Sequence, residues 1–242
     1  MSDKRIDVMI DLETMGLGTT APILSIGAVA FSQFGVGIEA TFHQGISLED
    51  SMVSGRVPTA STILWWLQQS DEARKQVRQK CEHGDPAAAV LCEFDAWLQS
   101  LPGAPYVWGN GANFDIAILE QAYLDAGMRT PWGYRNVRCF RTLMSEFGIE
   151  ADWVKPAVAH DALADAEAQA RTLQNCMRRR AIGGYRLTKT NVRCETADGL
   201  GACYIDPLRV EQEDDGSVTV VVAAWPDKNP GDAEMDSRGP SA

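Results

Sequence analysis

Val8–Gly18 reads VMIDLETMGLG and joins a short apolar run to two carboxylates, Asp11 and Glu13. The apolar run around Asp11 predicts a buried β-strand over residues 6–12, at the centre of a sheet. Asp11 and Glu13 are two residues apart, so both side chains point to one face of that strand. Burying two like charges in a dry core is costly, so this face needs solvent or a cation. The pair alone leaves two interpretations open, a strand that ends in a solvated turn or part of a site for a hard divalent metal ion.

The hydrophobic pattern around this strand predicts an α/β domain. Two further strands follow at 21–31 and 37–46, which suggests an antiparallel meander of three strands. The period then changes to that of helices alternating with short strands. We expect helices at 59–69, 71–80, 87–101, 113–127 and 161–180, a strand at 104–110, and a strand edge with a short helix within 136–148. Gly127 is the expected glycine just beyond the C-terminus of the fourth of these helices.

The composition changes after Gly183 and Gly184. The segment from there to Trp225 is strand-like, and EDDGS at 213–217 is a hairpin-turn signal. The remainder is polar and rich in Pro, Gly and acidic residues, which is typical of disorder. The predicted parts are therefore an α/β domain at 1–183, a β-rich appendage at 184–226 and a disordered acidic tail at 227–242.

The net charge of −11 conceals two basic segments. Residues 195–242 hold 11 acidic and 3 basic side chains, so most of the negative charge is C-terminal. Residues 126–145 contain four arginines and residues 168–194 contain seven basic side chains, and neither segment contains an acid. Such clusters are suited to binding phosphate groups, although solvated helix faces produce the same pattern.

The expected location is the cytoplasm. The N-terminus lacks the apolar core of a signal peptide, and no apolar run is long enough to span a membrane. The six cysteines form no C-x-x-C pair, so we expect reduced thiols.

Three polar residues further along the chain extend the first pattern. Asp115 lies in the first turn of the helix that follows the short strand at 104–110. An acid at this position can be a site residue, or it can simply stabilise the helix through the dipole at its N-terminus. His160 and Asp165 stand five residues apart at the start of the last helix, and on an ideal helix they would diverge by about 140°. They converge only if His160 lies on the loop before the helix. Each of the three alone has an ordinary structural explanation.

The combination resembles the DEDDh exonucleases, the proofreading-type 3′–5′ exonuclease superfamily with an RNase H-like fold. IDLETMGL at 10–17, GNGANFDIAIL at 109–119 and HDALADA at 160–166 are similar to its three motifs, in the same order. The resemblance covers about residues 5–178, and residues 62–77 further resemble an exoribonuclease-like subgroup found in bacteria and phages. The residues that match the motifs are Asp11, Glu13, Asp115, His160 and Asp165.

The resemblance implies a fold, a reaction and a set of roles. The fold would be an RNase H-like mixed sheet flanked by helices, with a small C-terminal β appendage. Two Mg²⁺ or Mn²⁺ ions would serve hydrolysis at the 3′ end of RNA or DNA, releasing nucleoside 5′-monophosphates. Asp11 would bridge both ions, Glu13 and Asp165 would hold the ion on the water side, and Asp115 the other. His160 would be the general base.

Several further residues are candidates for contact with the substrate. Thr14 could bind the terminal 3′-OH, Gly16 could allow close approach of the backbone, and Met15 could pack on the last base or in the core. One of the adjacent tryptophans could stack on a base, or one could lie in the core and the other at a helix interface. Asn113 could contact a phosphate or cap the helix of Asp115. The predicted substrate-binding set is thus Thr14, Met15, Gly16, Trp65, Trp66 and Asn113.

Two other classes of function remain as alternatives. One is a non-catalytic nucleic-acid-binding module on the same fold, which the basic segments would also suit. The other is a small-molecule phosphatase, because D-x-E-T is superficially similar to the nucleophile loop of haloacid-dehalogenase-type enzymes, although that scheme leaves His160 without a role. The sequence does not distinguish RNA from DNA, and the subgroup resemblance leans slightly towards RNA. Since related enzymes are often dimers, a homodimer is one assembly that the resemblance allows.

Overall fold

The computed structural model describes residues 6–147, 153–184, 204–212 and 218–225. The chain divides into two compact units, Met1–Arg179 and Arg180–Ala242, and each is described by itself. Among the described helices, none combines the length and the apolar character needed to cross a lipid bilayer.

The first unit is built on a mixed sheet of five strands in the order β3-β2-β1-β4-β5. Its strands are β1 (Asp7–Thr14), β2 (Ile23–Phe31), β3 (Ala40–Gly45), β4 (Tyr106–Gly109) and β5 (Val137–Cys139). The first three strands pair antiparallel, whereas β4 and β5 join parallel to β1 and to each other. This confirms the predicted meander, with β1 at the centre of the sheet, and the mixed sheet of the predicted fold class.

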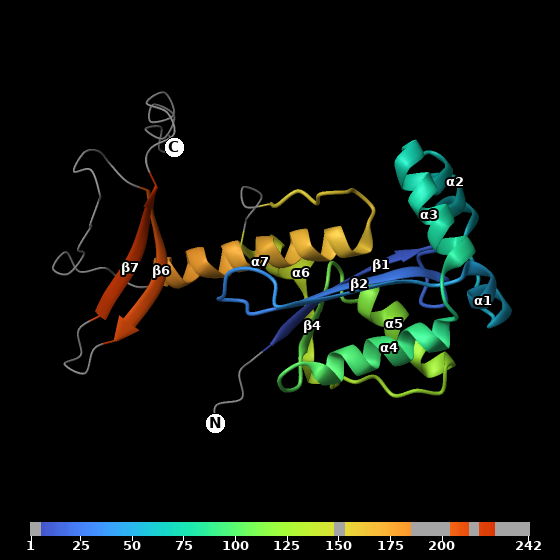
Figure 1. Cartoon of the computed structure of the whole chain (residues 1–242), viewed down its shortest axis with the longest axis horizontal. Helices are drawn as coiled ribbons and strands as arrows, with labels where there is room; N and C mark the ends of the chain where they lie inside the picture. The colour runs from blue at the N-terminus through green and yellow to red at the C-terminus, as the bar shows by residue number, and fades with distance from the viewer. Residues whose placement is uncertain (1–5, 148–152, 185–203, 213–217, 226–242) are drawn as a thin grey trace. The chain divides into compact units, whose positions relative to one another are not determined.

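Helices cover both faces of the sheet (Figure 1). They are α1 (Leu48–Val53), α2 (Ala60–Leu67), α3 (Asp71–His83), α4 (Ala87–Ser100), α5 (Asp115–Asp125), α6 (Phe140–Phe147) and α7 (Ala162–Gly184), with a 3-10 turn at Tyr134–Asn136. Gly127 has φ of 69° just after α5, the left-handed conformation predicted for it. Helix α1 was not predicted; it begins at Ser47, whose side chain accepts a hydrogen bond from the backbone N–H of Asp50.

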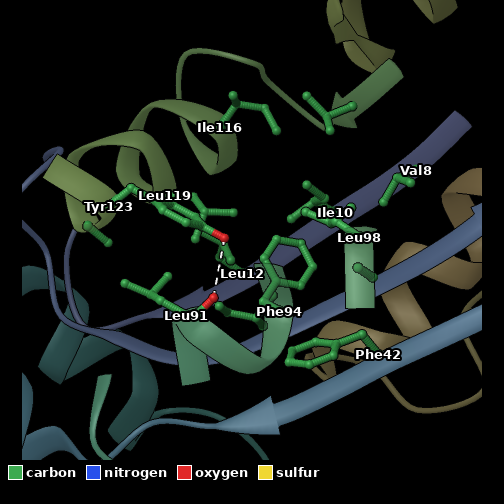
Figure 2. Close-up of a cluster of buried hydrophobic side chains, with 14 of the residues drawn as sticks. Val8, Ile10, Leu12, Phe42, Leu91, Phe94, Leu98, Ile116, Leu119 and Tyr123 are labelled. Carbon is green, nitrogen blue, oxygen red and sulfur yellow. Dashed lines mark hydrogen bonds between the residues drawn. The ribbon is translucent and has the colours of Figure 1, made fainter. Parts of the chain in front are cut away.

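Alternate residues of β1 face two different environments. Val8, Ile10 and Leu12 point into an apolar core formed with α4 and α5, which includes Phe94 and Leu119 (Figure 2). All five side chains are at most 5% exposed to solvent. This side of the sheet is a dry core, and its role is to stabilise the fold.

The other face of β1 packs against α7. Met9 lies in a second apolar cluster with Ala166, Ala170 and Leu173 of that helix. Asp11 follows Met9 by two residues, so its side chain points to the same face, towards the beginning of α7. The polar end of β1 is therefore directed at a helix and not at open solvent.

The second unit contains one antiparallel pair of strands, β6 (Tyr204–Gln212) and β7 (Val218–Trp225). This pair is the β structure expected of the C-terminal appendage. The predicted turn at 213–217 and the predicted acidic tail at 227–242 lie outside the described residues. The proposed boundaries of the three parts stay predictions.

Candidate active site

Three carboxylates from two segments that are far apart in the sequence of the first unit lie close together beside the central strand β1. Asp11 and Glu13 come from β1, and Asp165 comes from the first turn of α7. One carboxylate oxygen from each lies within 4.8 Å of the others, a spacing that can hold a metal ion. The sequence pairs Asp11 with Glu13, and the fold adds the third carboxylate from more than 150 residues away.

A glycine on β2 lets α7 approach the sheet this closely. Gly27 is paired with Asp11 across the antiparallel ladder. A Cβ atom on Gly27 would lie 2.1 Å from the carbonyl carbon of Ala162, the first residue of α7. Because that neighbour is backbone, the helix would have to move away, and Asp165 would move with it.

Asp115 enters from the neighbouring strand-to-helix turn. It is the first residue of α5, directly after β4, and it is 3% exposed. Its Oδ1 accepts a hydrogen bond from the backbone N–H of Leu12 at 3.3 Å. Gly109 leaves the room for it, since a Cβ there would lie 3.1 Å from the Asp115 side chain. Asp115 therefore lies close to Asp11, and its charge acts on both Asp11 and Glu13.

Burial raises the pKa of every one of these carboxyls, and repulsion by other carboxylates of the cluster adds to it for Asp11 and Glu13. Burial, followed by the charges of Asp115 and Glu13, raises the pKa of Asp11 well above its ordinary value. Burial and the charge of Asp165 raise the pKa of Glu13 to about 8. Burial also raises the pKa of Asp115, to about 7, and that of Asp165. The charges of Lys80 and Arg141 lower the pKa of Glu13 and Asp115 only in part. Ionising all four carboxyls together is therefore unfavourable, a condition that a bound cation would relieve.

His160 lies on the loop immediately before α7, the position that convergence with Asp165 required. Its φ is 60°, a left-handed conformation that costs a non-glycine residue roughly 1–3 kcal/mol. In this conformation its backbone N–H donates to the Asp165 carboxylate. The imidazole is half-buried and its ring centroid lies 5.0 Å from that of Trp65. His160 and Asp165 therefore belong to one site despite their spacing along the chain.

Gln169 is a member of the site that sequence analysis missed. Its side-chain Nε2 donates to Asp11 Oδ1 at 2.8 Å, and the residue is only 3% exposed. Its other amide atom, Oε1, is buried with no hydrogen-bond partner within the described part of the chain. The available signal was its position four residues after Asp165, which puts both on one face of α7.

An ion pair at the edge of the cluster was also missed. Lys80 of α3 lies 3.2 Å from Asp161 Oδ2, and His43 Nε2 lies 3.8 Å from the same oxygen. Asp161 Oδ1 accepts from the backbone N–H of Ala164 and so caps the start of α7. Burial favours the neutral acid, but this N–H and the Lys80 charge together lower the pKa of Asp161. The motif HDALADA thus contributes a helix cap as well as His160 and Asp165.

The residues after Glu13 are buried in this structure. The Thr14 hydroxyl donates to the Gly16 carbonyl at 2.7 Å. The Met15 side chain packs with Leu24, Trp66 and Val77, which is the core alternative that the sequence left open. A Cβ at Gly16 would lie 3.0 Å from the Ala21 side chain, so internal packing already accounts for this glycine. Contacts of these three residues with a substrate stay predictions.

The tryptophan pair divides as expected into one buried and one exposed side chain. Trp66 is 5% exposed and donates its indole N–H to the Thr14 carbonyl, whereas Trp65 is 42% exposed. The prediction that Asn113 caps α5 is wrong. The residue at the N-cap position is Phe114, and Asn113 lies one residue earlier. The other proposed role of Asn113, contact with a phosphate, stays a prediction.

The carboxylate cluster is suited to a hard divalent cation. All its charged ligand atoms are oxygens, the donor type that Mg²⁺ and Mn²⁺ prefer. Burial raises the pKa of Asp11 and Glu13, and Gln169 Oε1 is buried without a hydrogen-bond partner among the residues that the structure describes, so a further group is favoured at this site. The residues present therefore fit metal binding.

One curated relative and several solved structures are similar to this chain. An exodeoxyribonuclease of Enterobacteria phage T4 is 31% identical over 129 residues, which cover 49% of this chain and 56% of the phage protein. Crystal structures of Escherichia coli exonuclease I share 13% identity and a TM-score of 0.53. One is a complex with a dT13 oligonucleotide, covering 74% of this chain and 43% of that chain, and another is a zinc-bound complex with single-stranded DNA. At this identity the structural similarity establishes the fold.

The match to a family model is more extensive. The model described as the 3′-5′ exoribonuclease Rv2179c-like domain matches residues 6–177. The matched range contains all four carboxylates, His160 and the whole five-stranded sheet. It confirms the predicted exonuclease superfamily. On this evidence the chain belongs to the 3′-5′ exoribonuclease Rv2179c-like domain family.

Proposed function

We propose that this protein is a metal-dependent 3′–5′ exonuclease. It would hydrolyse the terminal phosphodiester bond at the 3′ end of RNA or DNA, releasing a nucleoside 5′-monophosphate and leaving a new 3′-OH on the shortened strand. The observation that carries the proposal is the convergence of Asp11, Glu13 and Asp165, whose carboxylate oxygens lie within 4.8 Å of one another. Asp115 accepts a hydrogen bond from the backbone N–H of Leu12 next to them, and His160 lies on the loop before α7. The chain spans 56% of the phage relative and 43% of the exonuclease I chain, so the activity is argued from the site itself.

The four carboxylates would hold two ions, Mg²⁺ or Mn²⁺. Glu13 and Asp165 would bind one ion and Asp115 the other, with Asp11 shared between them. When bound, the ions would supply a water of lowered pKa and would offset the negative charge that develops on the phosphate. Gln169, through its bond to Asp11 Oδ1, would keep one oxygen of the shared carboxylate in a fixed direction.

His160 would act as the general base. It would accept a proton from the attacking water as the new P–O bond forms and the bond to the 3′ oxygen of the penultimate nucleotide breaks. The imidazole is half-buried beside Asp165, so one edge of it remains accessible to a substrate. General base catalysis of this kind contributes about 10²- to 10⁴-fold to a rate.

Basic side chains on the first unit would bind the phosphates of the strand. Arg141 lies close to the loop of Asp115, because its guanidinium would be 3.7 Å from a Cβ placed on Gly111. Its charge lowers the pKa of Asp115, which burial otherwise raises. It belongs to the basic segment at 126–145, whereas Arg171 of the other segment pairs with Glu167. Phosphate contacts of this kind make binding weaker as salt concentration rises.

One assay tests the proposal. The full chain is incubated with 5′-labelled RNA and DNA, single-stranded or with 3′ overhangs, in Mg²⁺, Mn²⁺ or EDTA, and the products are resolved over time. We expect a ladder that shortens from the 3′ end only with metal. Cleavage from the 5′ end, or undiminished cleavage by Asp11→Asn, would contradict the proposal. Binding without turnover in every condition would favour a non-catalytic nucleic-acid-binding module. Size-exclusion chromatography of the same sample would decide whether the protein acts as a homodimer.

A further inference from the structure

The pair of helices α2 and α3, residues 60–83, approaches the active site from outside the carboxylate cluster. Neither helix carries one of the five residues that match the exonuclease motifs. Both lie at the end of the sheet where β1 finishes (Figure 1). Both helices contact the loop that precedes α7: α2 packs against His160, and α3 forms an ion pair with Asp161, the residue that follows it.

The first contact is between aromatic rings. The ring centroids of Trp65 and His160 are 5.0 Å apart with an interplanar angle of 85°. Trp66 adds a second, longer contact, with its centroid 6.1 Å from that of His160 at 81°. The two indoles also pack edge-on against each other at 4.9 Å. The imidazole therefore lies against a tryptophan pair, and such contacts restrict the tilt of an aromatic ring.

The second contact is the ion pair between Lys80 and Asp161. The Lys80 side chain is 15% exposed and that of Asp161 is 19% exposed, so both charges are largely shielded from solvent. Asp161 also caps α7 through Ala164, which fixes its side chain on the helix side. The peptide next to His160 is thus held between α3 and the start of α7. This matters because His160 has a left-handed backbone that the surroundings must maintain.

The same helix pair is tied to the strand that carries the first two carboxylates. Trp66 Nε1 donates to the Thr14 carbonyl at 3.0 Å, and the backbone N–H of Thr59, just before α2, donates to the Met15 carbonyl at 2.9 Å. This helix pair therefore contacts both the end of β1 and the His160 loop. It can fix the distance between the carboxylates of β1 and the imidazole.

We propose that Trp65 and the Lys80–Asp161 ion pair position His160 to accept the proton of the attacking water. They are positioning residues, acting through His160 and without touching the reacting atoms. The proposal rests on the proposed function, in which His160 is the base. A displacement of about 1 Å in a reacting group can cost on the order of 10²-fold in rate, so the loss of such contacts is measurable.

A double-mutant cycle between Trp65 and His160 tests the first contact. We expect Trp65→Ala to lower kcat by about 10- to 100-fold with KM changed by less than about twofold, and Trp65→Phe to restore most of it. In a His160→Ala background, with turnover followed at high enzyme concentration, Trp65→Ala should cause no further loss. Leu64→Ala, an exposed neighbour on α2, is the matched control and should leave kcat unchanged.

Two results would overturn this role for Trp65. An increase in KM at constant kcat would mean that the indole stacks on the substrate and not on the base. Equal losses of kcat with and without His160 would mean that Trp65 acts elsewhere. Thermal melting of each variant shows whether the fold survives, and Trp65→Leu offers a second apolar replacement if Trp65→Ala is unstable.

The ion pair is tested in the same way. Lys80→Met should lower kcat by about tenfold, and Lys80→Arg should restore it. In a His160→Ala background Lys80→Met should cause no further loss. The matched control is Arg78→Met on the same helix, which breaks an exposed pair with Glu82 and should have no effect on kcat. A loss that persists without His160 would mean that Lys80 acts on Glu13 instead, and would overturn its assigned role.

A spectroscopic measurement separates this inference from the proposed activity. The protein has three histidines, so the imidazole resonances of His160 are identified by their absence in His160→Ala. In metal-free protein, Trp65→Ala should shift these resonances and Leu64→Ala should not. If wild-type protein degrades no nucleic acid, the proposed function fails whatever the spectra show. If it degrades nucleic acid, Asp11→Asn is inactive and the His160 resonances do not respond to Trp65, the positioning role alone fails.

Discussion

The two faces of β1 show how one strand serves stability and chemistry with alternate residues. Val8, Ile10 and Leu12 enter an apolar core in which Phe94 and Phe42 have ring centroids 5.0 Å apart. Met9, Asp11 and Glu13 face α7. Met9 packs against apolar side chains of that helix, whereas Asp11, two residues later, is already part of the carboxylate cluster. On the first face the buried groups need nothing further, whereas on the second they repel one another until a cation is bound. Changes on the two faces should therefore have separable effects.

The largest effect is expected from Asp11→Asn, which removes the shared carboxylate. Activity should fall on the order of 10⁴-fold, as when one member of a catalytic unit is lost. Stability without metal should increase, because one of four repelling acids is gone. The measurements are 3′-end degradation with Mg²⁺ and urea unfolding in EDTA. Asp7→Asn is the matched control, since Asp7 is on the same strand but accepts a hydrogen bond from Trp108. A stability loss in Asp11→Asn would contradict the comparison.

The opposite outcome is expected from Phe94→Ala in the apolar core. Phe94 is fully buried and stacks against Trp97 at 5.7 Å, so the cavity should lower the free energy of unfolding by about 3–5 kcal/mol. Below the new melting temperature, kcat should remain close to wild type. Urea unfolding and the exonuclease assay at low temperature check both halves. Phe94→Leu should show a smaller loss, and a large drop in kcat of folded protein would mean that the two faces are coupled.

The sequence was sufficient to predict the features that depend on local pattern. The three antiparallel strands, β1 at the sheet centre and His160 on the loop before α7 all follow from hydrophobic period and helix geometry. The brief helix α1 was missed because six residues give almost no periodicity, and only Ser47 marks its start. The alternation of side chains along β1 also placed Asp11 and Glu13 on one face. The pair could be recognised as part of a site only together with the motifs around Asp115 and His160.

The missed residues are those whose role comes from tertiary packing. Gln169 is an ordinary polar residue on a helix until α7 is laid against Asp11, and Gly27 is an unremarkable strand glycine until Ala162 approaches it. Lys80 and Asp161 are 81 residues apart, and no local pattern pairs them. The prediction that Asn113 caps α5 was wrong for a related reason, since the loop places Phe114 at the cap.

The pH dependence of stability gives an intermediate effect that belongs to the α7 face alone. Because the pKa of Glu13 in the folded protein is about 8, above its ordinary 4.5, the folded state holds a proton that the unfolded state has lost. The contribution is therefore complete below about pH 4.5 and disappears as the pH rises through 8. In EDTA, the free energy of unfolding should fall by about 4 kcal/mol between pH 5 and pH 8.5, and Mg²⁺ should restore it at the higher pH.

A variant comparison isolates this contribution from the other titrating groups. Glu13→Gln should flatten the pH profile measured by urea unfolding, while Phe94→Leu should lower the whole curve without changing its slope. If the pH profiles of stability for Glu13→Gln and wild type are parallel in EDTA, the carboxylates do not repel one another as inferred. The two faces of β1 would then not differ in their electrostatics.

The smallest effect is expected from Gln169→Leu, which tests how finely the polar face is arranged. The substitution keeps the side chain's approximate size and removes its bond to Asp11 Oδ1, so all four carboxylates remain. Loss of such a supporting contact typically costs about 10- to 100-fold in activity or metal affinity. Activity as a function of Mg²⁺ concentration separates the two, since weaker binding shifts the midpoint and misorientation lowers the plateau.

Gln174→Leu is the matched control for this experiment. Gln174 is equally buried on α7, but it donates to the carbonyls of Ser32 and Gly37, away from the cluster. Both variants lose a buried amide and should lose comparable stability, because each leaves hydrogen-bonding groups without their partner. Only Gln169→Leu should change the Mg²⁺ dependence. If the two variants behave alike in the activity assay, Gln169 only stabilises the packing of α7 against the sheet, and Asp11 is held by its strand alone.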